Sequence, residues 1–147
     1  MFYLIDTNVL IRLADRNDPR HLTVRTALRQ LQQDNHQLQI ASQNCIEFWN
    51  VATRPIRNNG LGLTPNNGKK LLDLLERLFP IVPDTPAVYF EWRRLVATHN
   101  VSGVQVHDAH LVATMKVRGI SRILTFNTKD FTRYTNEGII AIDPARV

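Results

Sequence analysis

The chain has 147 residues, a length typical of one compact domain with a substantial hydrophobic core. Apolar residues make up 44% of the sequence, which argues against wholesale disorder, and no apolar run approaches the ~20 residues of a membrane span. The net charge of +5 and the pI of about 9.9 favour an anionic partner, such as a nucleic acid or an acidic protein. The single cysteine, Cys45, excludes an internal disulfide and a cysteine-rich zinc site. No charged leader precedes the first apolar run, so we expect no signal peptide and a cytoplasmic location.

Strand-like and helical patterns alternate along the chain. Short continuous apolar runs predict strands at 2–5, 38–41, 81–82, 122–126 and 138–142. Amphipathic spacing predicts helices near 9–14, 21–33, 46–52, 70–79, 85–96 and 106–117, with a short helical turn at 128–134. Residues 57–67 are rich in Gly, Pro and Asn, and we expect them to form an exposed loop. The alternation predicts one α/β domain over residues 1–147, with a short central parallel β-sheet flanked by helices.

Four acidic residues stand at joints between the expected elements: Asp6, Glu47, Asp108 and Asp130. Because the carboxyl ends of parallel strands share one edge of a sheet, we expect the four side chains to meet in one cleft. Carboxylate oxygens are the ligands that Mg²⁺ prefers, and two such ions about 3.5–4 Å apart promote phosphodiester cleavage. The sequence therefore predicts that these acids are both the metal ligands and the catalytic residues.

Each acid also has a purely structural explanation. Asp6 is placed to cap the helix that follows the first strand, and Glu47 follows Asn44 by three positions, which is typical of a capping box. Asp108 complements the dipole of its helix, and Asp130 is placed to cap a turn. The apolar neighbours of Glu47 and Asp108 favour the metal explanation, because an unpaired carboxylate near a buried rim is costly.

Short polar side chains accompany the acids: Thr7, Asn8, Thr125 and Asn127. They are placed to orient the carboxylates, a water or a phosphate, although turn and cap hydrogen bonds explain them equally well.

Among several basic clusters, Arg54 and Arg57 follow the helix that carries Glu47 and are predicted to contact the phosphate of a substrate. His107 and His110 flank Asp108 but share a helix face only with each other, which makes zinc a weak alternative.

Four segments together resemble the PIN-domain nucleases, and most closely the VapC-type toxins of bacterial toxin–antitoxin pairs. They are Ile5–Leu10, Glu47-Phe48 with Arg54-Pro55, His107–Ala109 and Leu124–Phe131. The resemblance implies a parallel α/β fold, cleavage of RNA that depends on Mg²⁺ or Mn²⁺, a homodimer, and inhibition by an antitoxin that covers the cleft.

The resemblance also assigns roles to individual residues. The family's acidic positions fall on Asp6, Glu47, Asp108 and Asp130, and its polar supporting position falls on Thr125 or Asn127. Many members carry an acid where Asn127 stands, so this chain offers fewer ligands for a second metal ion.

Three functions are compatible with these features. The first is a divalent-metal-dependent ribonuclease toxin with RNA and an antitoxin as partners and no membrane partner. The second is a catalytically weak or inactive PIN-like module that binds RNA or protein. The third is a phosphatase or response-regulator-like domain phosphorylated on Asp6, against which the lack of a second Asp at Asn8 argues.

Overall fold

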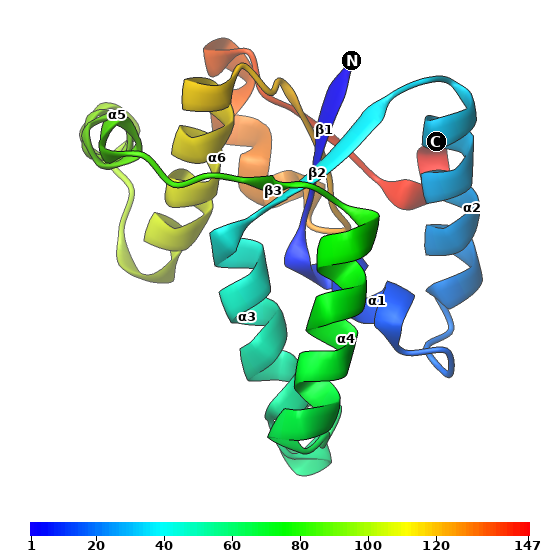
Figure 1. The fold of residues 1–147 in the computed structure, drawn as a ribbon. Helices are drawn as coiled ribbons and strands as arrows, with labels where there is room; N and C mark the ends of the chain where they lie inside the picture. Colours follow the sequence, from blue (N-terminus) through cyan, green and yellow to red (C-terminus); the bar gives the residue numbers. More distant parts are fainter.

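Five short strands form one sheet in the order β3-β2-β1-β4-β5, as the computed structural model shows for residues 1–147 (Figure 1). The strands are β1 (Phe2–Ile5), β2 (Gln37–Ala41), β3 (Ile81–Val82), β4 (Arg122–Leu124) and β5 (Ile140–Ile142). Every pair of neighbouring strands is parallel, and β1 lies at the centre between β2 and β4. The predicted α/β fold with a short parallel sheet is confirmed.

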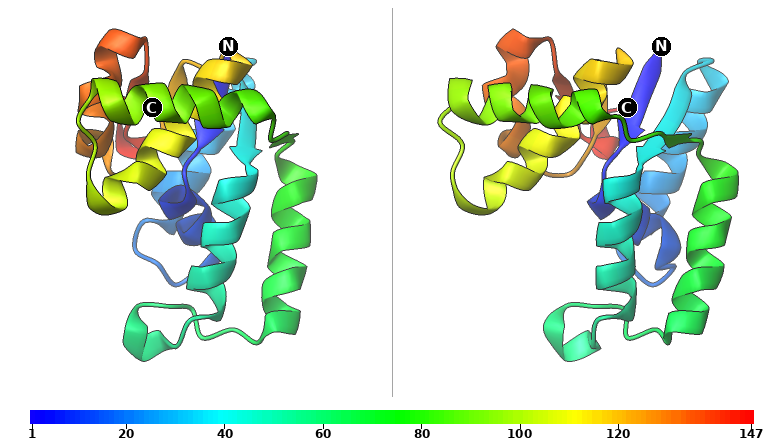
Figure 2. Two further views of the ribbon diagram at one scale, coloured as in Figure 1. Left: turned by 90° about the vertical axis from the view of Figure 1, so that its left-hand side faces the viewer. Right: turned by 60° about the vertical axis from the view of Figure 1, so that its left-hand side comes forward.

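Six α-helices connect and cover the strands. They are α1 (Thr7–Ala14), α2 (His21–Gln33), α3 (Ser42–Thr53), α4 (Pro65–Leu78), α5 (Pro86–Thr98) and α6 (Val106–Arg118). Four 3₁₀ segments are η1 (Ile56–Asn58), η2 (Gly103–Gln105), η3 (Thr128–Glu137) and η4 (Pro144–Arg146). α3 and α4 run side by side away from the sheet, whereas α5 lies across α6 on the other side (Figures 1 and 2). None of these helices combines the length and the apolar character that a membrane crossing requires.

The core has two parts, one on each face of the sheet, and β1 contributes to both. Leu4 packs into the part formed with α5, α6 and η3, whereas Tyr3 and Ile5 pack into the part formed with α1, α2, α3 and α4. Alternate side chains of a strand point to opposite faces, so a strand covered on both sides must be apolar throughout. Leu4 and Ile5 are both 0% exposed, and each such burial stabilises the fold by about 1.5–3 kcal/mol.

The expected loop over residues 57–67 is partly wrong, because α4 begins at Pro65 and not at Lys70. Thr64 caps the helix by accepting a 3.2 Å hydrogen bond from the backbone N–H of Asn67, and Pro65 fills the first helical turn. The Asn-Asn-Gly run, which is typical of a turn, lies inside the helix. A Cβ at Gly68 would lie 3.1 Å from Thr53 Cγ2, so the glycine allows α4 to approach α3 closely.

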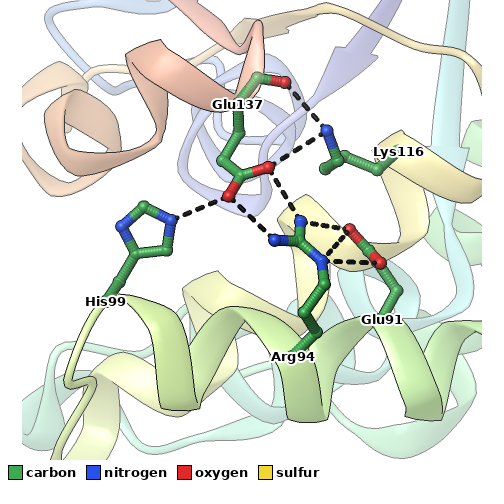
Figure 3. Close-up of polar contacts among 5 residues, drawn as sticks. All are labelled: Glu91, Arg94, His99, Lys116 and Glu137. Carbon is green, nitrogen blue, oxygen red and sulfur yellow. Dashed lines mark hydrogen bonds and ion pairs between the residues drawn. The ribbon is translucent and has the colours of Figure 1, made fainter.

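A network of charged side chains fixes the end of η3 against α5 and α6 (Figure 3). Both carboxylate oxygens of Glu137 accept hydrogen bonds from Arg94, at 3.1 and 2.8 Å. His99 Nε2 lies 3.0 Å from Oε1, and Lys116 Nζ lies 3.2 Å from Oε2. These partners, Arg94 above all, lower the pKa of Glu137 to about 2. The network therefore anchors the segment that carries Asp130.

Candidate active site

A cavity of about 500 Å³ lies where β1 ends, and three of the four predicted acids line it. Asp6 enters from the end of β1, Glu47 from α3 and Asp108 from α6. These residues are far apart in the sequence, and the parallel sheet brings them to one edge. The other predicted residues that line the cavity are Thr7, Asn8 and Asn127.

Asp6 is the most completely fixed of these acids. Its Oδ1 accepts a 2.7 Å hydrogen bond from the backbone N–H of Thr7, so it caps α1. Its Oδ2 accepts from the hydroxyl of Thr125 at 2.7 Å and from Nδ2 of Asn8 at 3.1 Å. Burial raises the pKa of Asp6 to about 6, although the hydrogen bonds from Thr125 and Thr7 oppose the shift. Asp6 is thus a helix cap and a cavity carboxylate at the same time.

Asn8 and Thr125 join the ends of β1 and β4 beneath the cavity. Nδ2 of Asn8 donates to the Thr125 hydroxyl at 3.1 Å, and its Oδ1 accepts from the backbone N–H of Phe126 at 3.1 Å. The same hydroxyl accepts from the backbone N–H of Asn127 at 3.0 Å. Thr125 is 0% exposed and does not line the cavity, so it acts on the site only by positioning other groups.

Glu47 is held at both of its oxygens, and it does not form the capping box. The Thr7 hydroxyl donates to Oε2 at 2.9 Å, and Nε2 of Gln43 donates to Oε1 at 2.9 Å. Asn44 takes the capping role instead, because its Oδ1 accepts from the backbone N–H of Ala41 at 2.9 Å. The helix begins at Ser42, which puts Asn44 in its first turn and Glu47 beyond it.

Gln43 is a residue of the site that the sequence did not reveal. Its Nε2 also donates to the backbone oxygen of His107 at 2.8 Å, so it ties α3 to the start of α6. Because both neighbours of Nε2 are acceptors, the amide oxygen must face His110, whose Nδ1 lies 2.6 Å away. Nδ1 of His110 therefore carries a proton and donates it to Gln43.

Asp108 lies in the first turn of α6, half-buried, and its side chain makes no hydrogen bond within the protein. The pKa of Asp108 is raised to about 7, first by burial and then by the negative charges of Asp6, Asp130 and Glu47, while Arg133 has a smaller lowering effect. The helix dipole alone would lower this pKa. The raised value shows that the surroundings of Asp108 are dominated by burial and by other carboxylates.

The remaining predicted residues lie outside the cavity. Asp130 is exposed in the first turn of η3 and does not line the cavity, yet its charge raises the pKa values of Asp6 and Asp108. Arg54 donates to the backbone oxygen of Asn59 at 3.4 Å, and Arg57 is exposed on η1. The only cation that lines the cavity is Arg12, which the sequence did not single out.

The donor set suits a hard divalent cation. No three His, Cys, Asp or Glu side chains stand close enough together to form a ready group of metal ligands. His107 and His110 therefore do not belong to such a group either. However, Asp6, Glu47 and Asp108 face one cavity without any ion pair, and burial raises the pKa values of Asp6 and Asp108. A bound cation would offset the cost of ionising these carboxylates. The residues therefore fit Mg²⁺ or Mn²⁺ better than zinc, whose usual ligands are thiolates and imidazoles.

Three solved structures show the same fold over nearly the whole chain. VapBC2 from Rickettsia felis, bound to a DNA fragment from its promoter, is 17% identical, covers 97% of this chain and 98% of its own, and has a TM-score of 0.74. VapBC-1 from nontypeable Haemophilus influenzae is 16% identical, covers 98% of both chains, and has a TM-score of 0.72. VapC20 from Mycobacterium tuberculosis, a sarcin-ricin loop cleaving toxin, is 17% identical, covers 94% of this chain and 96% of its own, and has a TM-score of 0.61.

A family comparison agrees with the structural one. No curated protein sequence matched the chain. The family model described as "PIN domain" matches residues 3–137, which include every acid of the site, all of β2, β3 and β4, and β1 apart from Phe2, whereas β5 lies beyond the match. The chain therefore belongs to the PIN-domain family, and its structural neighbours are toxins of toxin–antitoxin complexes.

Proposed function

We propose that this protein is a divalent-metal-dependent ribonuclease that hydrolyses RNA phosphodiester bonds and serves as the toxin of a toxin–antitoxin pair. One observation carries the proposal: Asp6, Glu47 and Asp108 face a single cavity, and none of them forms an ion pair. Membership of a family whose members are typically nucleases supports it, and so does the net charge of +5, which favours an anionic substrate.

In this proposal Asp6, Glu47 and Asp108 hold Mg²⁺ or Mn²⁺ from the cavity, and Asp130, which lies outside it but whose charge acts on Asp6 and Asp108, completes the ligand set. The ion would supply Lewis-acid stabilisation of the negative charge that develops on the phosphate during hydrolysis. The chain itself supplies orientation: Thr125 fixes Asp6, and the Thr7 hydroxyl fixes Glu47. Outer groups that orient ligating carboxylates typically change metal affinity by about 10–100-fold.

The proposed partners are RNA, a cognate antitoxin and a second copy of this chain. The Rickettsia felis and Haemophilus influenzae relatives were crystallised as VapBC complexes, which supports an antitoxin. Ile46 on α3 and Tyr89 on α5 line one surface groove and are 70% and 54% exposed, and an apolar patch of this kind supports a homodimer. Light scattering on the purified chain measures its mass directly, and a monomeric mass would remove the dimer from the proposal.

The test is RNA cleavage by the purified protein with Mg²⁺, with Mn²⁺ and with EDTA. We expect cleavage only with a metal ion, and a loss of at least about 100-fold in Asp6→Asn and Asp108→Asn. Glu76→Gln removes an exposed carboxylate on α4 that lies outside the cavity and forms no ion pair, so it should cleave like the parent. Circular dichroism verifies that each variant is folded.

Two results would contradict the proposal. If the Asp6 and Asp108 variants cleave RNA as fast as the parent, the site is not the one that cuts. If the protein binds RNA tightly without metal and cleaves no RNA, it is an inactive PIN-like binding module.

A further inference from the structure

Arg12 stands out because it is the only cation among the residues that line the acidic cavity. It lies in the last turn of α1, where a basic side chain also complements the helix dipole. A purely structural role would leave the guanidinium satisfied by protein groups. The contacts of Arg12 show that it is not.

The guanidinium of Arg12 is fixed in place but largely unpaired. Nη1 donates to the backbone oxygen of Asn8 at 2.9 Å, and the guanidinium carbon lies 5.1 Å from the ring centroid of Phe126. No carboxylate lies within 4.0 Å of it, and its buried Nε has no hydrogen-bond partner. A rigid, planar donor fork of this kind matches the oxygens of a phosphate.

Two other carboxylates that line the same cavity form no ion pair with Arg12, and each accepts a hydrogen bond from the turn after α1. Asp15 Oδ1 accepts from the backbone N–H of Asn17 at 3.1 Å. Asp18 Oδ1 accepts from the backbone N–H of Arg20 at 2.7 Å. Both acids hold the turn in place, and neither forms an ion pair with Arg12.

A second guanidinium lies over the same aromatic ring. The guanidinium carbon of Arg20 is 4.9 Å from the centroid of Phe126, and Arg20 also has no ion pair. Two positive charges near one ring repel each other, and an anion beside them removes that repulsion. Arg12, in the cavity lining, and Arg20, outside it, therefore form a positive edge beside a cavity that also contains the acids of the candidate site.

Asn8 links this positive edge to the acids. Its side chain holds Asp6, and its backbone oxygen holds Arg12. The distance between the acid and the guanidinium is therefore set by a single residue in the first turn of α1. We propose that Arg12, supported by Arg20, binds a backbone phosphate of the RNA strand whose cleavage we propose for the acidic site.

The test measures the affinity for RNA as a function of salt concentration. Every variant also carries Asp108→Asn, which is expected to prevent cleavage, so that the RNA strand stays intact. A fluorescein-labelled single-stranded oligoribonucleotide is titrated with protein in Mg²⁺ buffer at several NaCl concentrations. Each phosphate contact on a single strand contributes about 0.7 to the slope of log Kobs against log salt concentration. We expect Arg12→Gln to reduce the slope by about 0.7 and to weaken binding about tenfold at low salt.

Two further variants separate a phosphate contact from loss of structure. Arg12→Lys keeps the charge, so it should keep the slope of the parent. Arg29→Gln removes an exposed charge on α2 that forms no ion pair and lies outside the cavity, so it should leave the slope unchanged. The melting temperature of every variant is measured in parallel.

The outcomes separate this inference from the proposed function on which it rests. If RNA binds and Arg12→Gln keeps the full slope, Arg12 is structural and this inference is wrong, while the ribonuclease proposal stands. The same conclusion holds if Arg12→Gln lowers only the melting temperature. If the parent neither binds nor cleaves RNA, both proposals are wrong.

Discussion

The hydroxyl of Thr125 donates a 2.7 Å hydrogen bond to Oδ2 of Asp6, across 119 positions of the sequence. The two residues follow β4 and β1, which are neighbours in the sheet. Burial raises the pKa of Asp6, and this hydrogen bond is the largest influence that lowers it. Thr125 therefore favours the ionised form of Asp6, which is the form that binds a cation.

Replacing this hydroxyl tests its role directly. Thr125→Val keeps the volume but leaves Oδ2 of Asp6 with Asn8 alone. We expect the affinity for Mn²⁺, measured by isothermal titration calorimetry, to fall by about 10–100-fold. Thr125→Ser retains the hydroxyl and should bind Mn²⁺ like the parent. Equal affinity in the valine variant would show that the hydrogen bond does not prepare the site.

The stability of the metal-free protein should depend on pH through Asp6 and Asp108, whose pKa values are raised to about 6 and about 7. A group with a raised folded pKa stabilises the fold below its unfolded pKa, and this stabilisation is lost as pH rises through the folded value. The free energy of unfolding in EDTA should therefore fall between about pH 4 and about pH 8. Urea unfolding measures it.

A matched variant isolates one of these groups. Asp108→Asn does not titrate, so its free energy of unfolding should fall less steeply near neutral pH. Saturating Mg²⁺ should reverse the trend, because ligating carboxylates must lose their protons. A parent whose metal-free stability falls no more steeply over this range than that of Asp108→Asn would contradict the assignment.

Gln43 should matter for metal binding although it carries no charge. Gln43→Ala removes the donor that holds Oε1 of Glu47 and the link to the backbone oxygen of His107. We expect Mn²⁺ affinity to fall about 10–100-fold and the free energy of unfolding to fall by about 1–2 kcal/mol. Gln33→Ala, at an exposed position on α2, serves as the control. Unchanged metal affinity would limit Gln43 to a structural role.

Glu137 should contribute to stability but not to catalysis. Glu137→Gln removes the charge that Arg94, His99 and Lys116 share, so the free energy of unfolding should fall by about 1–3 kcal/mol at neutral pH. Because the folded pKa is lowered, the contribution is present above the unfolded value and is lost as pH falls toward about 2. The difference between parent and variant should therefore vanish in acid, as urea unfolding would show.

The fold was predictable because β1 and the other strands are short apolar runs between amphipathic helices. A strand covered on both faces leaves a continuous apolar pattern, and this pattern does not depend on distant residues. The start of α4 was missed because Asn-Asn-Gly is typical of a turn. The Thr64 cap and Pro65 favour a helix locally, and the close approach of Gly68 to Thr53 on a distant helix explains why a glycine stands inside it.

The residues of the candidate site also differ in whether the sequence alone reveals them. Asp6 was visible because a carboxylate directly after a buried strand is locally unusual. Gln43 was invisible because its role depends on the backbone oxygen of His107, which lies 64 positions away. Arg12 was hidden by its ordinary place in an amphipathic helix, whereas Arg54, which the sequence did indicate, contacts the oxygen of Asn59.

The central place of β1 has a consequence for synthesis of the protein. The ribosome makes β1 first, but its neighbour β4 comes only at Arg122–Leu124, near the end of the chain. A nascent chain that has not yet reached Thr125 carries Asp6 without the hydroxyl that favours its ionised form. The arrangement around Asp6 is therefore completed only when most of the chain has been translated, so the cleavage activity that we propose would appear only near the end of synthesis.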